Sequence, residues 1–588
     1  MQLTSEQLAA IATDEDLVIN AVAGSGKTTT LIEYARSRPT TSKILYLAFN
    51  KTVKTEAIQK FEKAGLNNVK IETAHSLAFD HIVKFSQFKV VPEYKSYEWC
   101  DLLGIKSGDR LVDFMIASHV NKFISYFCNS TAPRVQDLKY LNVITDPIAQ
   151  TFVQNFYAAI EKNTRAALAK MDKAEISITH DFYLKRFQLN KPTLEYDYIL
   201  FDEGQDASSA MLDVFLNQKA IKVIVGDAHQ QIYSWRYAIN SLQRVNFPVY
   251  NLSNSFRFDD EIALVANKIL GWKKHLGLLP ATKIVGIGQS ADIQTKATLG
   301  RTNLSLLINA IAKWQHGEIK KVFFEGNINS YTFADEGASL YDVLNLYNGK
   351  TDKIKDKLIG SMNSMRDLED YIKKTEDNSL AMIVEVVKEF GNRLPSLIQE
   401  LKSNHTTKKE DADMIFSTVH RCKGMEYDEV TLLNDFINES KLKKYIEQSG
   451  GDKINEANKN RLSEEINILY VAATRAKSKL IIPPETNPLQ SVQLAQTPPA
   501  LLSNSYKGYL RNADPDLYSN SKYERNKRTR SSNHGKKWSD EEENLLEELF
   551  RQGTSLDEIA KQLQRGSYGV RIKLVNMGLM DEGEDLDF

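Results

Sequence analysis

The chain has 588 residues, of which 42% are hydrophobic and 26% charged, and its formal net charge is −1. This length is too great for one hydrophobic core, so roughly three to five domains are expected. The near-zero charge excludes an argument for nucleic-acid binding from bulk charge, and no apolar run is long enough to cross a bilayer. The N-terminus lacks the basic-then-apolar order of a secretory signal. Because three widely spaced cysteines (Cys100, Cys128 and Cys422) show neither metal-ligand nor disulfide spacing, we expect a reducing cytoplasm.

A glycine-rich turn follows the first strand-like run, residues 16–20. Glycines allow successive backbone N–H groups to converge on a phosphate, and the N-terminus of the following helix favours negative charge. Lys27 is predicted to reach the β- and γ-phosphates of a nucleotide and Thr28 to bind Mg²⁺, although Ala21 occupies the first glycine position of the full motif. The alternative is an ordinary glycine-rich turn. The candidate phosphate-binding residues are Ala23, Gly24, Ser25, Gly26, Lys27, Thr28 and Thr29.

Strand-like runs alternate with helical patterns in two blocks of the chain, which is typical of parallel α/β sheets. The runs of the first block are 16–20, 43–49, 197–202 and 221–226, and those of the second block are 321–324, 414–419, 428–433 and 478–482. Two segments lack this rhythm, 85–190 and 330–410, and are predicted to be helical insertions. A proline-rich run that begins at Pro483 marks the end of the compact core.

Two carboxylates, Asp202 and Glu203, come at the end of the predicted strand 197–202. Ligands bind at the carboxyl ends of parallel strands. Asp202 is therefore predicted to hold Mg²⁺, and Glu203 to orient and deprotonate an attacking water molecule. The alternative is a chance pair of acids at a strand end.

A polar loop follows the predicted strand 221–226. Its Gln230 can sense a γ-phosphate through a hydrogen bond. Its aromatic residues Tyr233 and Trp235 offer surfaces on which unpaired bases can stack. Packing in the core is the alternative role of these two side chains.

In their order along the chain, these motifs resemble those of superfamily 1A helicases, the group of UvrD, Rep and PcrA. The motif sequences are most similar to those of F-box DNA helicases. The resemblance covers about residues 1–485. It implies that Gln7 reads the adenine edge, for which the alternative is a capping box with Thr4. The other nucleotide contacts that it implies are Phe256 stacked on adenine, Arg257 at the γ-phosphate, Glu426 as a link between DNA and nucleotide, and Arg475 as the arginine finger.

The same resemblance implies an α/β fold with two RecA-like P-loop domains, each with a helical insertion, and a small all-α C-terminal module outside it. The expected domains are 1–84 with 191–250 (domain 1A), 85–190 (insertion 1B), 251–329 with 411–485 (domain 2A), 330–410 (short insertion 2B), 486–535 (basic linker), 536–580 (helical module) and 581–588 (acidic tail). The implied contacts to single-stranded DNA are Phe49, Asn50, Thr73, His75, Tyr233, Trp235, Thr418 and His420.

The chain departs from the family's usual wording at Gly204, Ser255 and Cys422. None of these departures removes a side chain that the chemistry needs. The insertion at 330–410 is short beside the corresponding domain of UvrD-type proteins. The prediction of ATP hydrolysis does not depend on it, whereas the regulation of unwinding cannot be carried over from the family.

Residues 536–580 are predicted to form three short helices, the first with Ser539 as its N-cap and Glu542 at the capping-box position. With Trp538 at its start, the module resembles a Myb/SANT-like helix-turn-helix, in which the third helix enters the major groove. A protein-binding three-helix bundle is the alternative. The basic run 521–537 is expected to add phosphate contacts, and the acidic end to compete for the basic groove or dock on a partner. The candidate reading residues are Arg565, Ser567, Tyr568, Arg571 and Lys573.

The expected function is that of an ATP-dependent DNA helicase or translocase moving 3′-to-5′ on single-stranded DNA and at single-strand/duplex junctions, with ATP and Mg²⁺ as cofactors. A DNA-stimulated ATPase that mainly strips bound protein, and a DNA-bound ATP switch directed by the C-terminal module, are the alternatives. A partner nuclease or a replication or repair protein is compatible with this sequence, and no membrane partner is expected. The lack of an attached F-box favours a bacterial or mobile-element origin and the cytoplasm, or the nucleus if the source is eukaryotic.

Overall fold

The computed structural model forms two compact units, Met1–Asp514 and Pro515–Phe588. The structure describes residues 2–234, 237–278, 282–289, 292–326, 328–331, 340–449, 454–489, 538–552, 554, 556–565, 570, 573, 574, 577 and 579. Some predicted features lie outside the described residues, namely Trp235, Ser567, Tyr568, Arg571, nearly all of the basic linker and the acidic end at 581–588.

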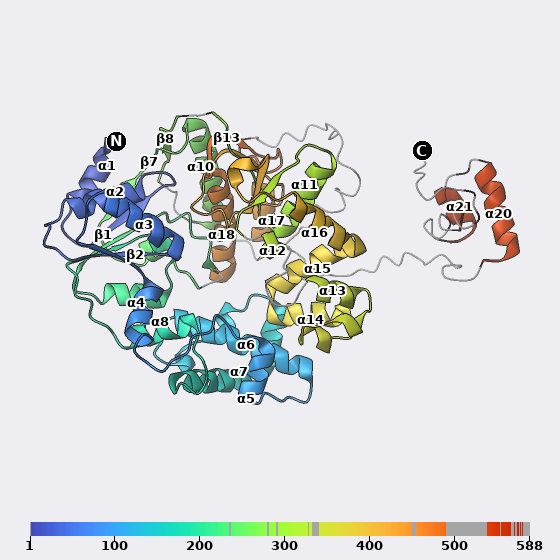
Figure 1. The fold of residues 1–588 in the computed structure, drawn as a ribbon, viewed down its shortest axis with the longest axis horizontal. Helices are drawn as coiled ribbons and strands as arrows, with labels where there is room; N and C mark the ends of the chain where they lie inside the picture. Colours follow the sequence, from blue (N-terminus) through green and yellow to red (C-terminus); the bar gives the residue numbers. More distant parts are fainter. Residues whose placement is uncertain are drawn as a thin grey trace. The chain divides into compact units, whose positions relative to one another are not determined.

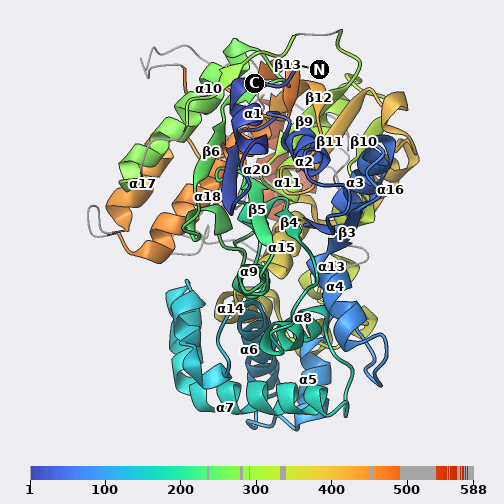
Figure 2. The same cartoon turned by 90° about the vertical axis from the view of Figure 1, so that its left-hand side faces the viewer.

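Six parallel strands form the first sheet, in the order β3-β2-β4-β5-β1-β6. The four interior strands are largely buried on both faces, as their nearly continuous apolar sequences require. In the register, Leu17 of β1 lies opposite Val223 of β5, and Val18 lies opposite Val249 of β6. The strands are β1 (Leu17–Ala21), β2 (Ile44–Ala48), β3 (Val69–Thr73), β4 (Tyr198–Phe201), β5 (Ile221–Gly226) and β6 (Val249–Leu252). The helices that accompany this sheet are α1 (Ser5–Ile11), α2 (Lys27–Arg36), α3 (Lys51–Lys63), α4 (Ala74–Ile82) and α9 (Ser209–Leu216), of which the first four are labelled in Figure 1 and α9 in Figure 2.

Five parallel strands form the second sheet, in the order β10-β11-β9-β12-β13. The short pair β7 (Asn254–Ser255) and β8 (Val285–Gly286) stands outside it. The strands are β9 (Lys296–Gly300), β10 (Val322–Phe324), β11 (Met414–Thr418), β12 (Tyr427–Leu432) and β13 (Ala476–Ile481). The accompanying helices are α10 (Asp260–Gly271), α11 (Asn303–Gln315), α17 (Glu439–Gln448) and α18 (Glu456–Ala473), of which α10, α17 and α18 lie together in Figure 2.

Two helical insertions interrupt the sheets. The first lies between α4 and β4 and the second between β10 and β11 (Figure 1). The helices of the first are α5 (Ser96–Leu103), α6 (Arg110–Asn129), α7 (Pro147–Asp172) and α8 (His180–Leu189). Those of the second are α12 (Ile328–Tyr331), α13 (Leu340–Tyr347), α14 (Met365–Thr375), α15 (Asn378–Phe390) and α16 (Leu394–Ser403).

The two insertions contact each other where α14 ends and α7 begins. Glu376, which ends α14, accepts hydrogen bonds from the backbone N–H groups of Thr145 (2.8 Å) and Asp146 (2.7 Å) at the start of α7. In return, Lys122 of α6 donates to the carbonyl of Glu376 (3.0 Å), and His119 lies 2.8 Å from the carbonyl of Lys374. The last carbonyl groups of α14 thereby find partners in the first insertion, while the carboxylate of Glu376 holds the residues that lead into α7, whose first turn is capped by its own Asp146.

The strand-like runs identified in the sequence each overlap a strand, and 85–190 is mostly helical, so these predictions are confirmed. The sequence did not reveal β3, β6 or β9. In β3, charged residues alternate with half-buried ones; β6 is a largely exposed edge strand; and β9 contains no long apolar run. Among the described residues, no helix is both long and apolar enough to span a bilayer.

In the C-terminal unit, α20 (Asp540–Arg551) and α21 (Leu556–Gln562) surround a small apolar cluster. Ser539 and Glu542 form the predicted capping box. The buried residues of the cluster are Leu546, Ile559, Ala560, Leu563, Val570 and Leu574. This unit therefore has its own core.

Candidate active site

The turn between β1 and α2 requires glycine at two positions. Gly24 and Gly26 have φ angles of 75° and 79°, which L side chains rarely adopt. A Cβ at Gly24 would lie 2.6 Å from the Cβ of Arg257. Gly26 is the N-cap of α2 and provides no side-chain cap, so the N-terminus of that helix is not closed by its own cap residue.

The donor groups of this turn fit a phosphate chain. Lys27, Thr28 and Thr29 occupy the first turn of α2, and the Oγ of Ser25 is buried without a hydrogen-bond partner within the described chain. The side chain of Phe256 approaches the same turn, because its Cε2 is 4.0 Å from where a Cβ of Gly26 would lie. A helix N-terminus with a lysine and hydroxyl groups is a favourable place for an anion.

Gln7 takes part in two interactions. Its Oε1 accepts from the N–H of Thr4 (2.9 Å), and Thr4 Oγ1 accepts from the N–H of Gln7, so the predicted capping box is present. Its Nε2 donates to the carbonyl of Ser25 (3.3 Å) and to Thr30 Oγ1 (3.1 Å). The cap and the contact with the glycine turn therefore coexist, and adenine recognition by Gln7 stays a prediction.

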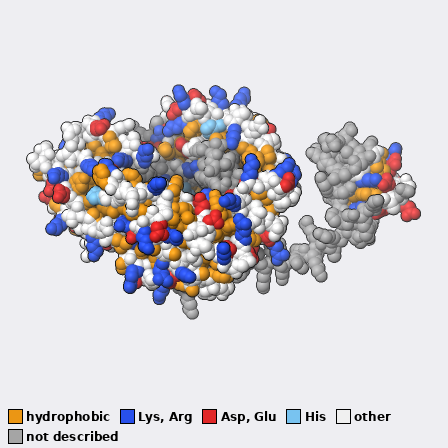
Figure 3. All heavy atoms as spheres, turned by 60° about the horizontal axis from the view of Figure 1, so that its bottom comes forward, with side chains coloured by type: hydrophobic (Ala, Val, Ile, Leu, Met, Phe, Trp, Pro, Cys, Tyr) orange, Lys and Arg blue, Asp and Glu red, His pale blue; other side chains and the backbone are white. Residues whose placement is uncertain are grey.

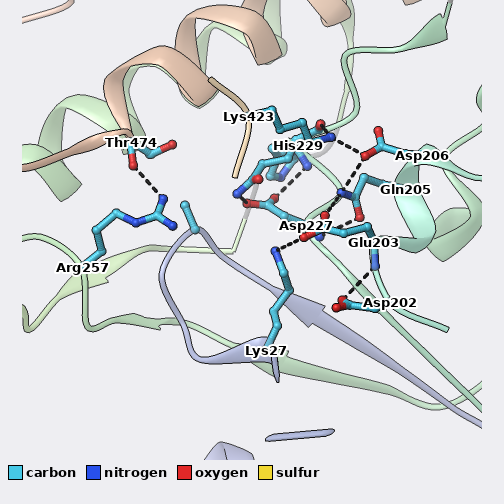
Figure 4. Close-up of polar contacts among 12 residues, drawn as sticks. Lys27, Asp202, Glu203, Gln205, Asp206, Asp227, His229, Arg257, Lys423 and Thr474 are labelled. Atoms are coloured by element: carbon cyan, nitrogen blue, oxygen red, sulfur yellow. Dashed lines mark hydrogen bonds and ion pairs between the residues drawn. The ribbon is translucent and has the colours of Figure 1, made fainter. Parts of the chain in front are cut away.

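The two acids lie at the carboxyl end of β4, across from Lys27 (Figure 4). Lys27 Nζ is 3.4 Å from Glu203 Oε1, and Glu203 has a left-handed φ of 52°. Asp202 accepts hydrogen bonds from the hydroxyl of Tyr46 and from the N–H of Glu203 (2.9 Å). The next residue must be small, since a Cβ at Gly204 would lie 2.5 Å from Ile224 Cγ1.

Burial and neighbouring charge set the ionisation of the acid pair. Burial, reinforced by the charge of Glu203, raises the pKa of Asp202. Burial alone would raise the pKa of Glu203, but Lys27 and Lys423 outweigh it and hold that pKa below its usual range. Burial likewise opposes the charge of Lys27, and the surrounding carboxylates nevertheless keep its pKa above its ordinary value. Glu203 is therefore ionised and can act as a base.

The second sheet contributes a tyrosine to this site. The hydroxyl of Tyr470, near the end of α18, donates to Asp227 Oδ2 (2.8 Å) and accepts from the N–H of Ala23 (3.3 Å). Asp227, which follows β5, also accepts from Gln230 Nε2 (2.9 Å). Neither Asp227 nor Tyr470 is among the site residues predicted from the sequence. The position of Asp227 at the end of a predicted strand was the available signal.

The second block, expected at 251–329 with 411–485, also contributes two arginines in different surroundings. Arg257 Nη2 is 2.6 Å from Glu426 Oε1, and its Nη1 donates to the carbonyl of Thr474 (2.8 Å) (Figure 4). Arg475 is 1% exposed and donates to the carbonyls of Val471 and Met425. Burial and the charge of Arg257 lower the pKa of Arg475 to about 10. Two clustered guanidinium groups, one of them buried, suit an anionic ligand.

Lysine and arginine side chains are interspersed with acidic and hydrophobic ones on the face of the Met1–Asp514 unit drawn in Figure 3. This distribution agrees with the formal net charge of −1. Overall charge is therefore no guide to where DNA binds, and local groupings must be considered.

Several predicted DNA contacts lie close together. The rings of Phe49 and Tyr233 are stacked, with centroids 5.8 Å apart and planes at 20°. The hydroxyl of Tyr233 donates to the carbonyl of His420 (3.0 Å), and Lys423 Nζ lies 4.9 Å from the centroid of the Tyr233 ring. His420 Nε2 is 3.1 Å from the carbonyl of Ile232. Residues from both sheets thus build one aromatic cluster.

The other predicted DNA contacts have local structural partners. Asn50 and Thr73 are the N-caps of α3 and α4, and Thr418 is buried at the end of β11. His75, which is partly exposed, lies 3.9 Å from Asp181. DNA contact by these four residues stays a prediction.

Lys423 joins the acid group to the aromatic cluster. Its Nζ contacts the carboxylate of Asp206 and donates to the carbonyl of Gln230 (2.6 Å) (Figure 4). Burial raises the pKa of Asp206 to about 6, against the opposing effect of Lys423. Neither Lys423 nor Asp206 is among the site residues predicted from the sequence.

The basic residues predicted to read DNA in the C-terminal module have acidic partners. Arg565 is buried, pairs with Glu542 (2.7 Å) and lies 4.2 Å from the centroid of the Trp538 ring. Lys573 forms an ion pair with Glu543. The part of this module that the structure describes thus uses both cations internally, and DNA reading by the module stays a prediction.

The fold and the site together define a P-loop protein whose glycine turn is approached by side chains from two parallel sheets. Residues 3–244 match the model of the UvrD/REP helicase N-terminal domain, and residues 140–485 match that of the UvrD-like helicase C-terminal domain. The chain belongs to the UvrD-like helicase family.

Curated relatives agree with this assignment. The chain is 30% identical over 492 residues to F-box DNA helicase 1 of Gallus gallus, covering 79% of this chain and 47% of the relative. It is 28% identical over 528 residues to F-box DNA helicase protein 1 of Schizosaccharomyces pombe, covering 82% and 57%. A probable DNA helicase II homolog of Mycoplasma pneumoniae is 25% identical over 301 residues, covering 46% and 42%. The chain thus spans about half the length of these relatives.

Proposed function

We propose that this protein is an ATP-dependent DNA helicase or translocase that moves 3′-to-5′ on single-stranded DNA and separates strands or displaces bound protein. The observation that carries the proposal is that Tyr470 and Arg257, from the second block, reach the glycine turn of the first. A nucleotide bound there would touch both blocks. Binding and hydrolysis would therefore change how the two blocks are held together.

The chemistry follows from the residues around the turn. Lys27 would bind the β- and γ-phosphates, and Glu203 would orient and deprotonate the attacking water. Thr28 and Asp202 are the residues that would hold Mg²⁺, which suits a metal bound by one or two protein groups together with substrate phosphates. When bound, Mg²⁺ would neutralise charge on the phosphates. Gln230 would sense the γ-phosphate.

Arg257 and Arg475 would stabilise the negative charge of the transferring phosphoryl group. Both belong to the second block, so they would act on a nucleotide held by the first. Glu426 orients Arg257 through the ion pair. An arginine finger contributes roughly 10³–10⁵-fold in rate in related NTPases.

The proposed DNA site is the aromatic cluster of Phe49, Tyr233 and His420. Stacking on an aromatic side chain is worth ~1–3 kcal/mol per base and does not select a sequence. The relatives named as DNA helicases support DNA as the substrate. The 3′-to-5′ direction comes from the family resemblance alone.

The first experiment measures ATPase activity with and without single-stranded DNA. We expect stimulation by DNA that Glu203→Gln abolishes. Glu33→Gln, an acid on α2 paired with Arg36, serves as the matched control. Absence of hydrolysis by the wild-type protein would contradict the proposal and favour a DNA-bound ATP switch directed by the C-terminal module.

The second experiment measures polarity. Partial duplexes with a 3′ or a 5′ single-stranded tail are incubated with ATP, and we expect unwinding only with the 3′ tail. A requirement for the 5′ tail would overturn the direction. ATPase activity with displacement of a bound protein, but without unwinding, would favour the protein-stripping role. For location, we propose the nucleus for a eukaryotic source, as the eukaryotic relatives suggest, and the cytoplasm for a bacterial one.

A further inference from the structure

The loop at residues 227–234 begins on the first sheet, directly after β5, yet much of it is held by the second block. The carboxylate of its first residue, Asp227, accepts a hydrogen bond from the hydroxyl of Tyr470. Its last, Ser234, donates its N–H to Glu464 Oε1 (3.0 Å) and its hydroxyl to Glu464 Oε2. Between them, the carbonyl of Gln231 accepts from Asn467 Nδ2 (2.8 Å).

The three residues that form hydrogen bonds with the loop lie on one face of α18. Glu464, Asn467 and Tyr470 are spaced three residues apart, which places them in a row along the helix. Asn467 is 3% exposed, so its bond to the loop is shielded from water. A hydrogen bond of this kind costs more to break than an exposed one, because the remaining carbonyl loses its partner in a buried place.

Other residues of the second block hold the rest of the loop. Lys273 Nζ lies 2.9 Å from His229 Nδ1, and Lys423 donates to the carbonyl of Gln230. His420 contacts the carbonyl of Ile232. Some bonds return to the first block: Gln205 accepts from the N–H of Asp227, and the side chain of Gln231 donates to the carbonyl of Ala238.

The loop carries one residue of each proposed ligand site. Gln230, which would sense the γ-phosphate, is three residues from Tyr233, which stacks on Phe49 of the first sheet. A displacement of the loop would therefore alter both the nucleotide site and the aromatic cluster. Glu464 and Asn467 belong to neither proposed site, because the groups they bind are Ser234 and the carbonyl of Gln231.

We infer that Glu464 and Asn467 are positioning residues that fix loop 227–234 to α18 and thereby couple nucleotide binding to single-stranded DNA binding. This inference rests on the proposed function. Coupling between two sites is measured by the factor by which one ligand changes the affinity for the other, commonly about 5–150-fold. If the loop is no longer held by α18, binding of one ligand has less effect on the affinity for the other.

The test measures that factor directly. The dissociation constant of a fluorescent oligothymidylate is determined without nucleotide and with a saturating non-hydrolysable ATP analogue. In the wild-type protein the two values differ by at least five-fold. In Asn467→Ala the difference falls to less than two-fold, and DNA stimulation of ATPase falls about ten-fold, while KM for ATP changes less than three-fold.

Asn460→Ala is the matched control, because Asn460 is exposed on the same helix. Glu464→Gln and Ser234→Ala form a second route if Asn467→Ala does not fold. Their double-mutant cycle should show that the two effects on coupling are not additive. Wild-type coupling in both Asn467→Ala and Glu464→Gln would overturn the inference. Absence of both ATP hydrolysis and DNA binding in the wild-type protein would instead refute the proposed function.

Discussion

In both sheets an interior strand, β1 or β9, is followed by a turn that leads directly into a helix, α2 or α11. In the second sheet the protein fills this turn with its own groups. Asp435 Oδ2 accepts from the N–H groups of Arg301 and Thr302 (both 2.9 Å), and Thr302 caps α11 through Ser305. In the first sheet the corresponding cap is Gly26, which has no side chain, and the hydroxyl of Ser25 has no hydrogen-bond partner among the described residues.

The difference teaches how one fold provides a structural turn and a ligand site at equivalent places. A carboxylate beside a helix N-terminus satisfies the same N–H groups and the same dipole as a phosphate would. With Asp435 present, the turn after β9 has its anion built in. In the part of the chain that the structure describes, no carboxylate accepts from the N–H groups of the turn after β1, so that turn is available to a nucleotide.

Lys27→Ala is expected to have the largest effect, because it removes a largely buried cation from a turn whose N–H groups have no carboxylate partner among the described residues. Loss of one group that stabilises a transition-state charge costs about 10²–10³-fold in rate. Steady-state ATPase assays at saturating DNA measure this loss, with Lys60→Ala on the exposed side of α3 as control. Activity within about three-fold of wild type would contradict the assignment.

Asp435→Ala is expected to come second, and to affect stability instead of chemistry. It leaves the N–H groups of Arg301 and Thr302 without their carboxylate, which costs about 1–3 kcal/mol. Hydrogen exchange over 301–305 should accelerate by about ten-fold or more, and the unfolding midpoint should fall. Asp411→Ala, at an exposed acid, should change neither. Unchanged exchange in Asp435→Ala would remove the proposed equivalence of the two turns.

Thr302→Ala should have a smaller effect of the same kind. Removing an N-cap hydroxyl costs about 1 kcal/mol, so the midpoint of thermal unfolding should fall by about one degree in a unit of this size. Thr302→Ser keeps the hydroxyl and should restore most of the loss. Equal losses in the two variants would mean that packing of the methyl group, and not capping, is responsible.

Ser25→Ala should have the smallest effect on stability, within about 0.5 kcal/mol, because its hydroxyl has no partner to lose. Affinity for ATP should fall by about 1 kcal/mol, or roughly five-fold, if the hydroxyl binds phosphate. Calorimetric titration and thermal unfolding of the same sample measure both quantities. A stability loss as large as that of Thr302→Ala would show that Ser25 is structural.

Much of the fold could be predicted because buried parallel strands consist of consecutive apolar residues. β4 and β5 are examples, since each combines an apolar run with an acid that follows it. β6 could not be found in this way, because an edge strand exposes half of its residues. The strand order was also beyond the sequence, because β1 pairs with strands that are distant along the chain.

In the candidate site, too, residues in local motifs could be predicted, whereas residues whose partners are distant along the chain could not. Lys27, Asp202 and Glu203 stand in short local motifs that constrain residue types at fixed spacing. Asn467 and Lys423 act through partners about 200 residues away, and on a helix or loop such polar side chains look like ordinary solvent-facing ones. Asp435 likewise follows a strand without any motif around it.

The position of β1 in its sheet has a consequence for folding. β1 is made first, but both of its neighbours, β5 and β6, lie 200 or more residues further along the chain. At ~5–20 residues per second, synthesis takes about 10–40 s to supply the first of them. The intervening insertion, built of local helical contacts, can fold during that time. During that time the apolar β1 has neither of its neighbouring strands to pair with, and unpaired apolar strands are prone to aggregate before their partners emerge.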